Sequence, residues 1–289
     1  MKIKSADFRV SSGKKVDLEK WPTRIKPYYG SPEQFQDAFK ESTKALASLQ
    51  RLLYASATHS VLLIFQAMDA AGKDSAIRNV FSGIDPHGCE VHSFKEPNAE
   101  ELKHDFLWRT TCRLPERGKI GIFNRSYYEE VLVVRVHPEY LKTQGIPEES
   151  IDEKSIWKER FESIIHSEKH LHRNGTHILK FFLHLSKEEQ RKRLLSRLDT
   201  PEKNWKFNIG DIKERKLWKQ YMRAYEDAIE TTTTDQAPWH IVPADDKKNA
   251  HLIISSIIGE TLKGLKMAYP SLDRHRRTEL EEIRKLLAK

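Results

Sequence analysis

One stretch of the chain has the residue types and spacing of a phosphate-binding loop. An apolar run from Val61 is followed by Gly72 and Lys73, where a strand would give way to a helix. In the template G-x-x-x-x-G-K-[ST], backbone N–H groups surround an oxyanion and the lysine neutralises it. Ala67 replaces the first glycine of this template, and Asp74 replaces the hydroxyl residue that binds magnesium. The stretch predicts contact with a phosphate group, with Lys73 as the central cation.

Polar residues also follow two other predicted strands. Lys95 follows the second strand, and Asn124 and Arg125 follow the third. Parallel α/β sheets bind ligands at the carboxyl ends of their strands, so we expect these residues to converge with Asp69 and Lys73 at one edge. A lysine loop, further cations and a group able to bind a metal suit phosphoryl transfer, in which catalysis is mostly positioning and stabilisation of charge.

The acceptor of such a transfer is suggested by what the chain lacks. Kinases that phosphorylate alcohols use a base, and the sequence contains no H-R-D-like loop. A phosphate acceptor, whose second pKa is about 6, is already largely anionic near pH 7 and needs no base. Repulsion between anions is then the obstacle, and cations relieve it. The chain has 50 Lys plus Arg against 42 Asp plus Glu, a net charge of +8, which indicates nucleic acid, an anionic membrane surface or a polyanionic small substrate as partner.

Each candidate also has an interpretation that needs no ligand. Asp69 and Asp74 could stabilise a helix dipole. Glu129 forms the pattern of a capping box with Ser126. Arg135 interrupts an apolar helical face and needs an anion, which is either Glu129 or a substrate phosphate.

The most basic segment, residues 191–223, has the pattern of a mobile cover over the site. A tract of sequence KNWK, residues 203–206, lies between two helical patterns. Trp205 and Trp108 are either core residues or stack on a base. Four cations form partly a solvated face and partly ligand contacts: Arg191, Lys192, Arg193 and Arg197.

Short apolar strands alternate with longer helical patterns, which favours parallel β-α-β units and one doubly wound sheet. The first predicted strand begins at Val61, and the others lie at residues 90–94, 118–123, 178–185 and 239–242. The predicted helices begin at Ser31, Ala76, Asn98, Ser126, Ser150, Ser186, Leu252 and Thr278. We expect an N-terminal arm over 1–30, one domain over 31–270 with a lid at about 187–223, and a C-terminal amphipathic helix within 271–289.

The composition excludes several other classes. Two cysteines, Cys89 and Cys112, suit a reducing cytoplasm. The start of the chain lacks the apolar core of a signal peptide, and no apolar run approaches the roughly 20 residues that span a bilayer. The thirteen histidines show no zinc spacing, and no G-x-S-x-G elbow is present. We expect a cytoplasmic protein without a membrane partner.

Five segments together resemble the family-2 polyphosphate kinases: QAMDAAGKDSAI, FKEPNAEELKHDFLWR, FNRSYYEEVLVVRVHPEYL, NWKFNIGDIKERKLW and APWHIVPADDK. They stand in the family's order across residues 35–265. The resemblance implies a three-layer P-loop kinase fold similar to thymidylate kinase, with a central parallel sheet of about five strands, flanking helices and a helical lid. It also implies transfer of the terminal phosphoryl group of inorganic polyphosphate to a nucleotide, with Mg²⁺, or alternatively Mn²⁺, as cofactor.

The resemblance assigns roles to individual residues. The implied catalytic residues are Asp69, Lys73, Asn124, Arg125 and Glu129. The implied metal ligands are Asp69, Asp74 and Asn124. The implied polyphosphate- and nucleotide-binding residues are Ala70, Ala71, Gly72, Asp74, Ser75, Lys95, Arg109, Arg135, Arg193, Arg197, Lys203, Trp205 and Lys206. Asn124, where many members have aspartate, resembles the subgroup that accepts both AMP and ADP. GMP and GDP as further acceptors, and assembly into a dimer or tetramer, are expected on the same basis.

Two other functions remain open on the residues alone. An ATP-dependent nucleoside monophosphate kinase could use the same fold, although Ala67 and Asp74 count against it. A non-catalytic RNA-binding protein could use Trp205 in the basic lid as a stacking platform. Because Trp205 and Phe207 belong to no repeated aromatic pattern, we expect no nucleic-acid partner.

Overall fold

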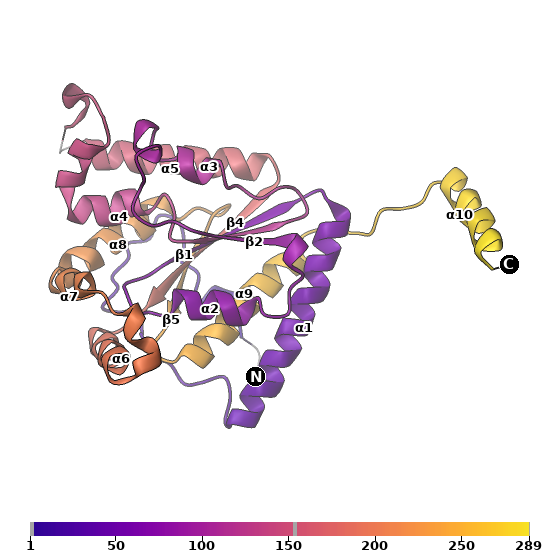
Figure 1. Ribbon diagram of the computed structural model, residues 1–289, viewed down its shortest axis with the longest axis horizontal. Helices are drawn as coiled ribbons and strands as arrows, with labels where there is room; N and C mark the ends of the chain where they lie inside the picture. The colour runs from indigo at the N-terminus through magenta and orange to yellow at the C-terminus, as the bar shows by residue number, and fades with distance from the viewer. Residues whose placement is uncertain (1–2, 153–154, 289) are drawn as a thin grey trace.

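The computed structural model describes residues 3–152 and 155–288, which form a three-layer α/β fold (Figure 1). Within this part of the chain, a five-stranded sheet has the order β2-β3-β1-β4-β5, and every neighbouring pair is parallel. The strands are β1 (Ser60–Gln66), β2 (Cys89–Ser93), β3 (Ile120–Asn124), β4 (Thr176–His184) and β5 (Trp239–Pro243). The predicted P-loop kinase-like architecture, with a parallel sheet and flanking helices, is confirmed.

The central strand β1 supplies two separate cores. Val61, Leu63 and Phe65 pack into the first core, whereas Leu62 and Ile64 pack into the second. Successive side chains of a strand point to opposite faces of the sheet. Because helices cover both faces, every residue of β1 is buried, and the strand is therefore a continuous apolar run rather than an alternating one.

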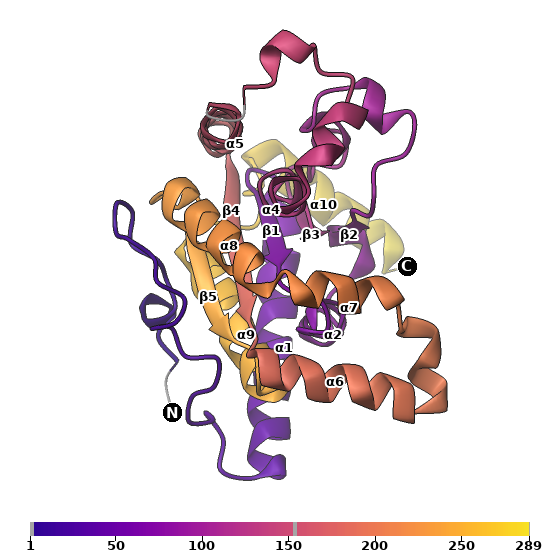
Figure 2. The same cartoon turned by 90° about the vertical axis from the view of Figure 1, so that its left-hand side faces the viewer.

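The longer helices divide between the two faces of the sheet (Figures 1 and 2). The first core is built on α1 (Pro32–Ser56), α2 (Lys73–Val80) and α9 (Lys247–Gly264). The second is built on α4 (Glu129–Val136), α5 (Ile156–Arg173) and α8 (Trp218–Thr232). The remaining α-helices of the described residues are α3 (Trp108–Thr111), α6 (Lys187–Asp199), α7 (Ile209–Lys216) and α10 (Arg274–Leu287).

Two helices form an outlying hairpin beside the carboxyl end of the sheet. In Figure 2, α6 extends away from the body and the chain returns through α7 to α8. Ser186 caps α6, because its Oγ accepts from the N–H of Glu189 at 3.1 Å, as the sequence predicts. α8 belongs to the body, since Tyr221 on its second turn is already buried in the second core. The hairpin therefore spans residues 187–216, and the end of the range 187–223 that the sequence assigns to the lid belongs to α8.

The N-terminal segment packs along the outer strand β5. Val10 donates its N–H to the carbonyl of Trp239 at 2.9 Å, and Ile241 donates to the carbonyl of Phe8 at 2.9 Å. Phe8 and Val10 are both buried. The segment thus covers an edge of the sheet that would otherwise expose unpaired backbone groups.

Several helix predictions need correction or a limit, and the helix predicted from Leu252 begins five residues earlier, at Lys247. Asn98 and Glu101 do exchange the predicted cap bonds, at 3.0 and 2.9 Å, but only the 3₁₀ turn Glu101–Lys103 and the single turn α3 follow. The helix predicted from Ser150 begins instead at Ile156, and residues 153–154 of that prediction lie outside the described residues. The last helix runs over Arg274–Leu287, slightly earlier than predicted, and residue 289 lies outside the described residues.

A membrane span is not found. Among the described residues, no helix combines the length and the apolar character needed to cross a bilayer.

Candidate active site

The phosphate loop connects the end of β1 to the start of α2. Ala70 and Gly72 both have left-handed backbone conformations, with φ of 61° and 106°. Glycine adopts this conformation without the steric cost that a side chain brings, which explains why glycine is needed at position 72. A further turn bond joins the N–H of Ala71 to the carbonyl of Met68 at 3.3 Å. The first N–H groups of α2, which follow at Lys73, have no partner inside the helix and can bind an anion.

The Lys73 side chain folds back over the loop. Its amine donates to the carbonyl of Ala67 at 2.7 Å. Desolvation lowers the pKa of the amine, the positive charge of Arg125 lowers it further, and the carboxylate of Asp69 opposes both effects. A neighbouring phosphate would add negative charge and stabilise the protonated amine.

The end of β3 lies directly beside the end of β1, with Phe65 and Asn124 in register. The Asn124 amide donates to Asp74 Oδ1 at 2.7 Å and to Ser93 Oγ at 3.4 Å. The next residue, Arg125, has φ of 65°. Parallel pairing of neighbouring strands thus joins two segments that lie far apart in the sequence, as the rule for strand ends predicts.

Arg125 joins the phosphate loop to α4. Its Nη2 lies 3.3 Å from Asp69 Oδ1, and its Nη1 lies 3.4 Å from Glu129 Oε2. The charge of Glu129 is the main cause of a raised Arg125 pKa; burial opposes it and Asp69 reinforces it. The guanidinium therefore stays charged, and it is held by two carboxylates rather than one.

The predicted capping box of Ser126 and Glu129 is wrong. Helix α4 begins at Glu129, its N-cap Tyr128 makes no side-chain cap bond, and the Glu129 carboxylate turns towards Arg125. With the Gln66 amide oriented so that its oxygen accepts from Ser126, its nitrogen donates to Glu129 Oε1 at 2.9 Å. Glu129 therefore positions Arg125, because both of its oxygens face groups of the site.

Arg193, near the start of the lid, donates hydrogen bonds to backbone carbonyls of the phosphate loop. Arg193 Nη1 donates to the carbonyls of Ala70 and Ala71 at 3.2 and 2.8 Å. Its Nη2 donates to the carbonyls of Ala244 and Asp245 at 2.7 and 3.1 Å. Its Nε donates to Glu189 Oε1 at 2.9 Å, so all five N–H groups of Arg193 are used within the protein.

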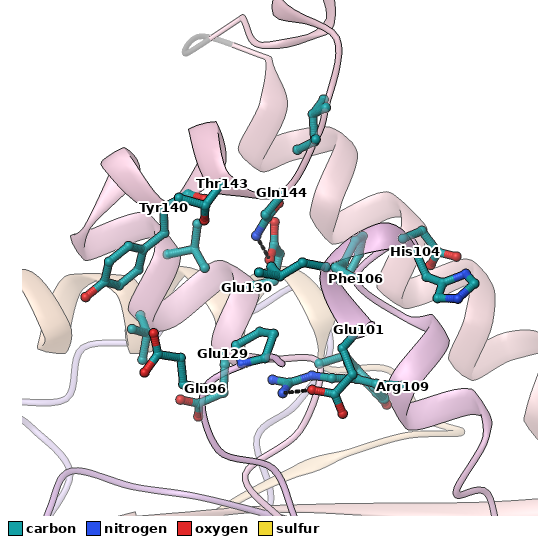
Figure 3. A pocket seen from close by; sticks show the side chains of 18 of the residues that line it. Glu96, Glu101, His104, Phe106, Arg109, Glu129, Glu130, Tyr140, Thr143 and Gln144 are labelled. Carbon is teal, nitrogen blue, oxygen red and sulfur yellow. Dashed lines mark hydrogen bonds and ion pairs between the residues drawn. The ribbon is translucent and has the colours of Figure 1, made fainter. Parts of the chain in front are cut away.

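A cavity of about 510 Å³ has Arg125 among its lining residues, and Figure 3 shows part of its wall. Its apolar wall includes Phe106, Val133 and Ile146. Lys95 also lines it. Arg109 lines it as well, but its Nη1 donates to the carbonyl of Lys95 at 2.7 Å. The volume suits one small organic ligand.

Most of the chain matches a protein-family model. The model described as polyphosphate kinase 2 matches residues 30–270. The chain belongs to the polyphosphate kinase 2 family. This match covers every strand of the sheet, the phosphate loop and the lid.

Similar proteins support the assignment along the full length. A protein from Rhodopseudomonas palustris named ADP-polyphosphate phosphotransferase is 58% identical over 289 residues, which is 100% of both chains. A protein from Meiothermus ruber named AMP/ADP-polyphosphate phosphotransferase is 43% identical over 264 residues, 91% of this chain and 94% of its own. The crystal structure of polyphosphate kinase 2 from Arthrobacter aurescens superposes with a TM-score of 0.88 at 36% identity and covers 99% of both chains. The chain is a polyphosphate kinase.

The remaining lid residues of this polyphosphate kinase lie farther out. Arg197 pairs with Asp211 at 2.9 Å. Trp205 is 77% exposed, and the Lys206 amine lies 5.0 Å from the centre of its ring. Lys203 is exposed in the same turn. These side chains lie at the tip of the hairpin, so Trp205 is not the core residue that one of the two sequence interpretations allowed.

Two predicted residues lie away from the phosphate loop. Arg135 pairs with Asp227 on α8 at 2.5 Å, so its anion in this structure is not Glu129. Trp108 stacks on His104 with ring centres 3.9 Å apart. Neither residue joins the cluster formed by Lys73 and Arg125.

Sequence reasoning missed a cation above the loop. Lys247 begins α9, and three residues separate it from Pro243 at the end of β5. Its Cε lies 3.7 Å from the position that a Cβ on Gly72 would occupy. Desolvation lowers the pKa of Lys247, the positive charge of Arg193 lowers it further, and the carboxylate of Glu189 opposes both effects. The strand-end rule that identified Lys95 would also have identified Lys247.

The oxygen atoms beside the loop fit a hard cation. Within the described residues, no three His, Cys, Asp or Glu side chains are grouped so that they could hold a metal. Mg²⁺, however, is usually bound by one or two carboxylates together with water and substrate phosphates. Asn124 Oδ1 is buried and has no hydrogen-bond partner among the described residues, and it belongs to the amide that contacts Asp74. Asp69, Asp74 and this oxygen are thus suitable ligands once phosphate oxygens complete the set.

Proposed function

We propose that this polyphosphate kinase transfers the terminal phosphoryl group of inorganic polyphosphate to AMP and ADP, and also to GMP and GDP. The observation that carries the proposal is the position of Arg125. Its guanidinium contacts Asp69 in the phosphate loop and Glu129 in the cavity wall. The Arg125 guanidinium thus faces both the phosphate loop and the cavity. A phosphoryl group that is transferred from the loop to a ligand in the cavity would lie beside it.

The donor end would bind at the loop. The N–H groups at the start of α2 and the amine of Lys73 would face the bound anion there, and Lys247 lies above Gly72. Lys203 and Lys206 are exposed farther along the lid. This row of cations suits an extended polyanion rather than a single phosphate.

The acceptor nucleotide would bind in the cavity. Apolar side chains such as Phe106 and Val133 can contact the base of the nucleotide, and Lys95 and Arg125 can face the phosphate of the nucleotide. In Figure 3, Gln144 reaches Glu130 within the cavity wall, and the two are joined by a hydrogen bond of 2.8 Å. These polar groups can bind the sugar or the base.

The transfer itself needs positioning and charge neutralisation rather than a base. The acceptor phosphate is largely anionic near pH 7, so the protein has to bring two anions together. Lys73 would hold the phosphoryl group at the loop, and Arg125 would bridge it to the acceptor. Mg²⁺, or Mn²⁺ in its place, would supply further charge neutralisation when held by Asp69, Asp74 and Asn124. The hairpin α6–α7 would exclude water from the transferring group.

We further propose that Asn124 allows AMP as well as ADP as acceptor. Its amide donates to Asp74 at 2.7 Å, whereas an aspartate here would place a second negative charge beside that carboxylate. The two similar proteins differ in name, since one is named for ADP alone and the other for AMP and ADP. If Asn124→Asp is made, we expect the ratio of AMP to ADP turnover to fall at least tenfold. An unchanged ratio would refute this role.

We also propose that the enzyme is a homo-oligomer, a dimer or tetramer, with α10 at an interface. Figure 1 shows α10 standing apart from the body. Leu280, Ile283 and Leu287 form an exposed apolar stripe on it, at the spacing of one helix face. Light scattering of the full chain and of a chain ending at residue 270 would test this. A monomeric full chain would contradict it.

We propose a cytoplasmic location on the basis of Cys89 and Cys112, which are both free thiols and suit a reducing compartment. Cell fractionation that finds the protein with membranes or outside the cytoplasm would contradict this location.

One assay tests the reaction. Purified enzyme is supplied with polyphosphate, Mg²⁺ and, in separate reactions, AMP, ADP, GMP or GDP, and the products are separated by chromatography. We expect ADP and then ATP from AMP, and the corresponding guanine products. Consumption of ATP without polyphosphate would indicate a nucleoside monophosphate kinase instead. RNA binding without any turnover would indicate a non-catalytic protein.

A further inference from the structure

A fully buried ion pair lies in the second core, away from solvent. Lys180 on β4 and Glu168 on α5 have 0% and 2% of their side chains exposed, and Lys180 Nζ lies 2.6 Å from Glu168 Oε2. Lys180 also donates to the Tyr128 hydroxyl at 2.9 Å and to the carbonyl of Thr232 at 2.8 Å. Because all three N–H groups of the amine are used inside the core, this lysine has no donor left for a substrate phosphate.

The same ion pair holds two consecutive residues of the active-site segment. The hydroxyls of Tyr127 and Tyr128 lie 2.9 and 2.8 Å from Glu168 Oε1. Burial, followed by the charge of Glu168, raises the pKa of both tyrosines well above the usual value. The hydroxyls therefore keep their protons and can donate to the carboxylate. A buried charge that is paired and hydrogen-bonded on all sides holds its neighbours in one arrangement.

The held segment follows directly after a strained arginine. Arg125 has a left-handed backbone with φ of 65°, which costs free energy in a residue with a side chain and persists only where the surroundings enforce it. On one side its N–H donates to the carbonyl of Phe65 at 3.0 Å. On the other side only Ser126 separates it from Tyr127. The strand and the tyrosines thus fix Arg125 from both directions.

We propose that the Glu168–Lys180 pair positions Arg125 for phosphoryl transfer. It acts through Tyr127 and Tyr128 and touches neither substrate. Without the tyrosine hydroxyl bonds, the Arg125 backbone relaxes and its guanidinium leaves the position between the loop and the cavity. The inference rests on the role proposed above for Arg125.

A double-mutant cycle tests this coupling. Tyr127→Phe/Tyr128→Phe removes both hydroxyls and keeps the rings. We expect kcat to fall about tenfold, with KM for polyphosphate and for nucleotide changed less than twofold. In an Arg125→Lys background, where the positioned guanidinium is already absent, the same pair of substitutions should change kcat less than twofold. An equal loss in both backgrounds would overturn the proposal, because the tyrosines would then act independently of Arg125.

A control variant separates positioning from simple loss of stability. The Trp239 indole donates to Thr232 Oγ1 at 2.9 Å, at the edge of the same cluster, and Trp239→Phe removes this bond while both tyrosines keep Glu168. We expect Trp239→Phe to lower the melting temperature and leave kcat within twofold. A tenfold fall in kcat in this variant as well would overturn the proposal.

A crystal structure of Tyr127→Phe/Tyr128→Phe gives a readout that does not depend on turnover. We expect Arg125 to leave the left-handed region and its Nη2 to move beyond ion-pair distance of Asp69. An unchanged Arg125 would overturn the inference even if the reaction is as proposed. Absence of any product from polyphosphate and nucleotide with the wild-type enzyme would instead refute the proposed function, and the crystal structure would still decide the positioning.

Discussion

Arg193 offers a direct test of whether the lid contributes geometry or only charge. The sequence assigns it to phosphate binding, whereas in the structure it donates to four backbone carbonyls, two of them in the phosphate loop. Substitution Arg193→Lys keeps the positive charge and removes the planar fork of donors. If Arg193 served only as a charge for polyphosphate, the lysine variant would keep most of its activity.

The expected loss can be worked from the bonds. A lysine presents three N–H groups on one nitrogen and cannot span both carbonyl pairs, so at least two charge-assisted bonds are lost. Each is worth about 1.5–3 kcal/mol, which gives a loss of about 3 kcal/mol at the lower limit. Because about 1.4 kcal/mol corresponds to a factor of ten in rate, kcat/KM for polyphosphate should fall roughly 100-fold if the loop must be ordered for transfer.

The same helix supplies a matched control. Arg191 is 55% exposed and, among the residues that the structure describes, pairs only with Glu188, at 2.7 Å, an arrangement worth about 0–1 kcal/mol. Initial rates of nucleotide formation and urea unfolding are measured for Arg193→Lys and Arg191→Lys. We expect the control to stay within twofold of wild type. Wild-type kcat/KM in Arg193→Lys, or equal losses in the two variants, would refute the bracing role.

Three further outcomes are expected. Lys73→Ala should lower kcat by at least 100-fold in the nucleotide assay while the far-ultraviolet circular dichroism stays unchanged; near-normal turnover would contradict the role of the loop. The affinity for polyphosphate should fall roughly 50-fold between 50 and 200 mM salt if about four cations contact the chain, and a flat response in a binding titration would argue against an extended cationic site. Lys180→Met should lower the free energy of unfolding by about 3–5 kcal/mol, since it leaves Glu168 buried without its cation; urea denaturation that shows a loss below 1 kcal/mol would contradict this.

The local elements of the fold follow from local sequence patterns. The first strand begins within one residue of its predicted start, and the other four lie within about two residues of their predicted bounds, because continuous apolar runs between helical patterns have few other ways to be buried. The caps of α1 and α6 are also local, since Ser31 and Ser186 accept from an N–H three residues ahead. Short segments were predicted less well. The helix expected after Asn98 is an example, since packing rather than its cap decides whether it forms.

The residues of the candidate site likewise divide into those that could be predicted from the sequence and those that could not. Lys73, Asn124 and Arg125 could be predicted, because a loop motif and the ends of neighbouring parallel strands are enough to bring them together. The partner of Arg135 could not be predicted, since Asp227 lies 92 positions away on another helix. Lys247 was missed although it follows a strand end, because nothing in its immediate sequence resembles a phosphate site.

The sequence by itself determined where the candidate site residues stand along the chain. Gly72 and Lys73 follow one apolar run, and a later apolar run ends at Asn124 and Arg125. These features depend on residue type and spacing over a few positions. Only the tertiary structure decided what each cation does. Arg193 braces the loop, and Arg125 stands between loop and cavity, because the partners of a long side chain are set by segments that meet only after the sheet has assembled.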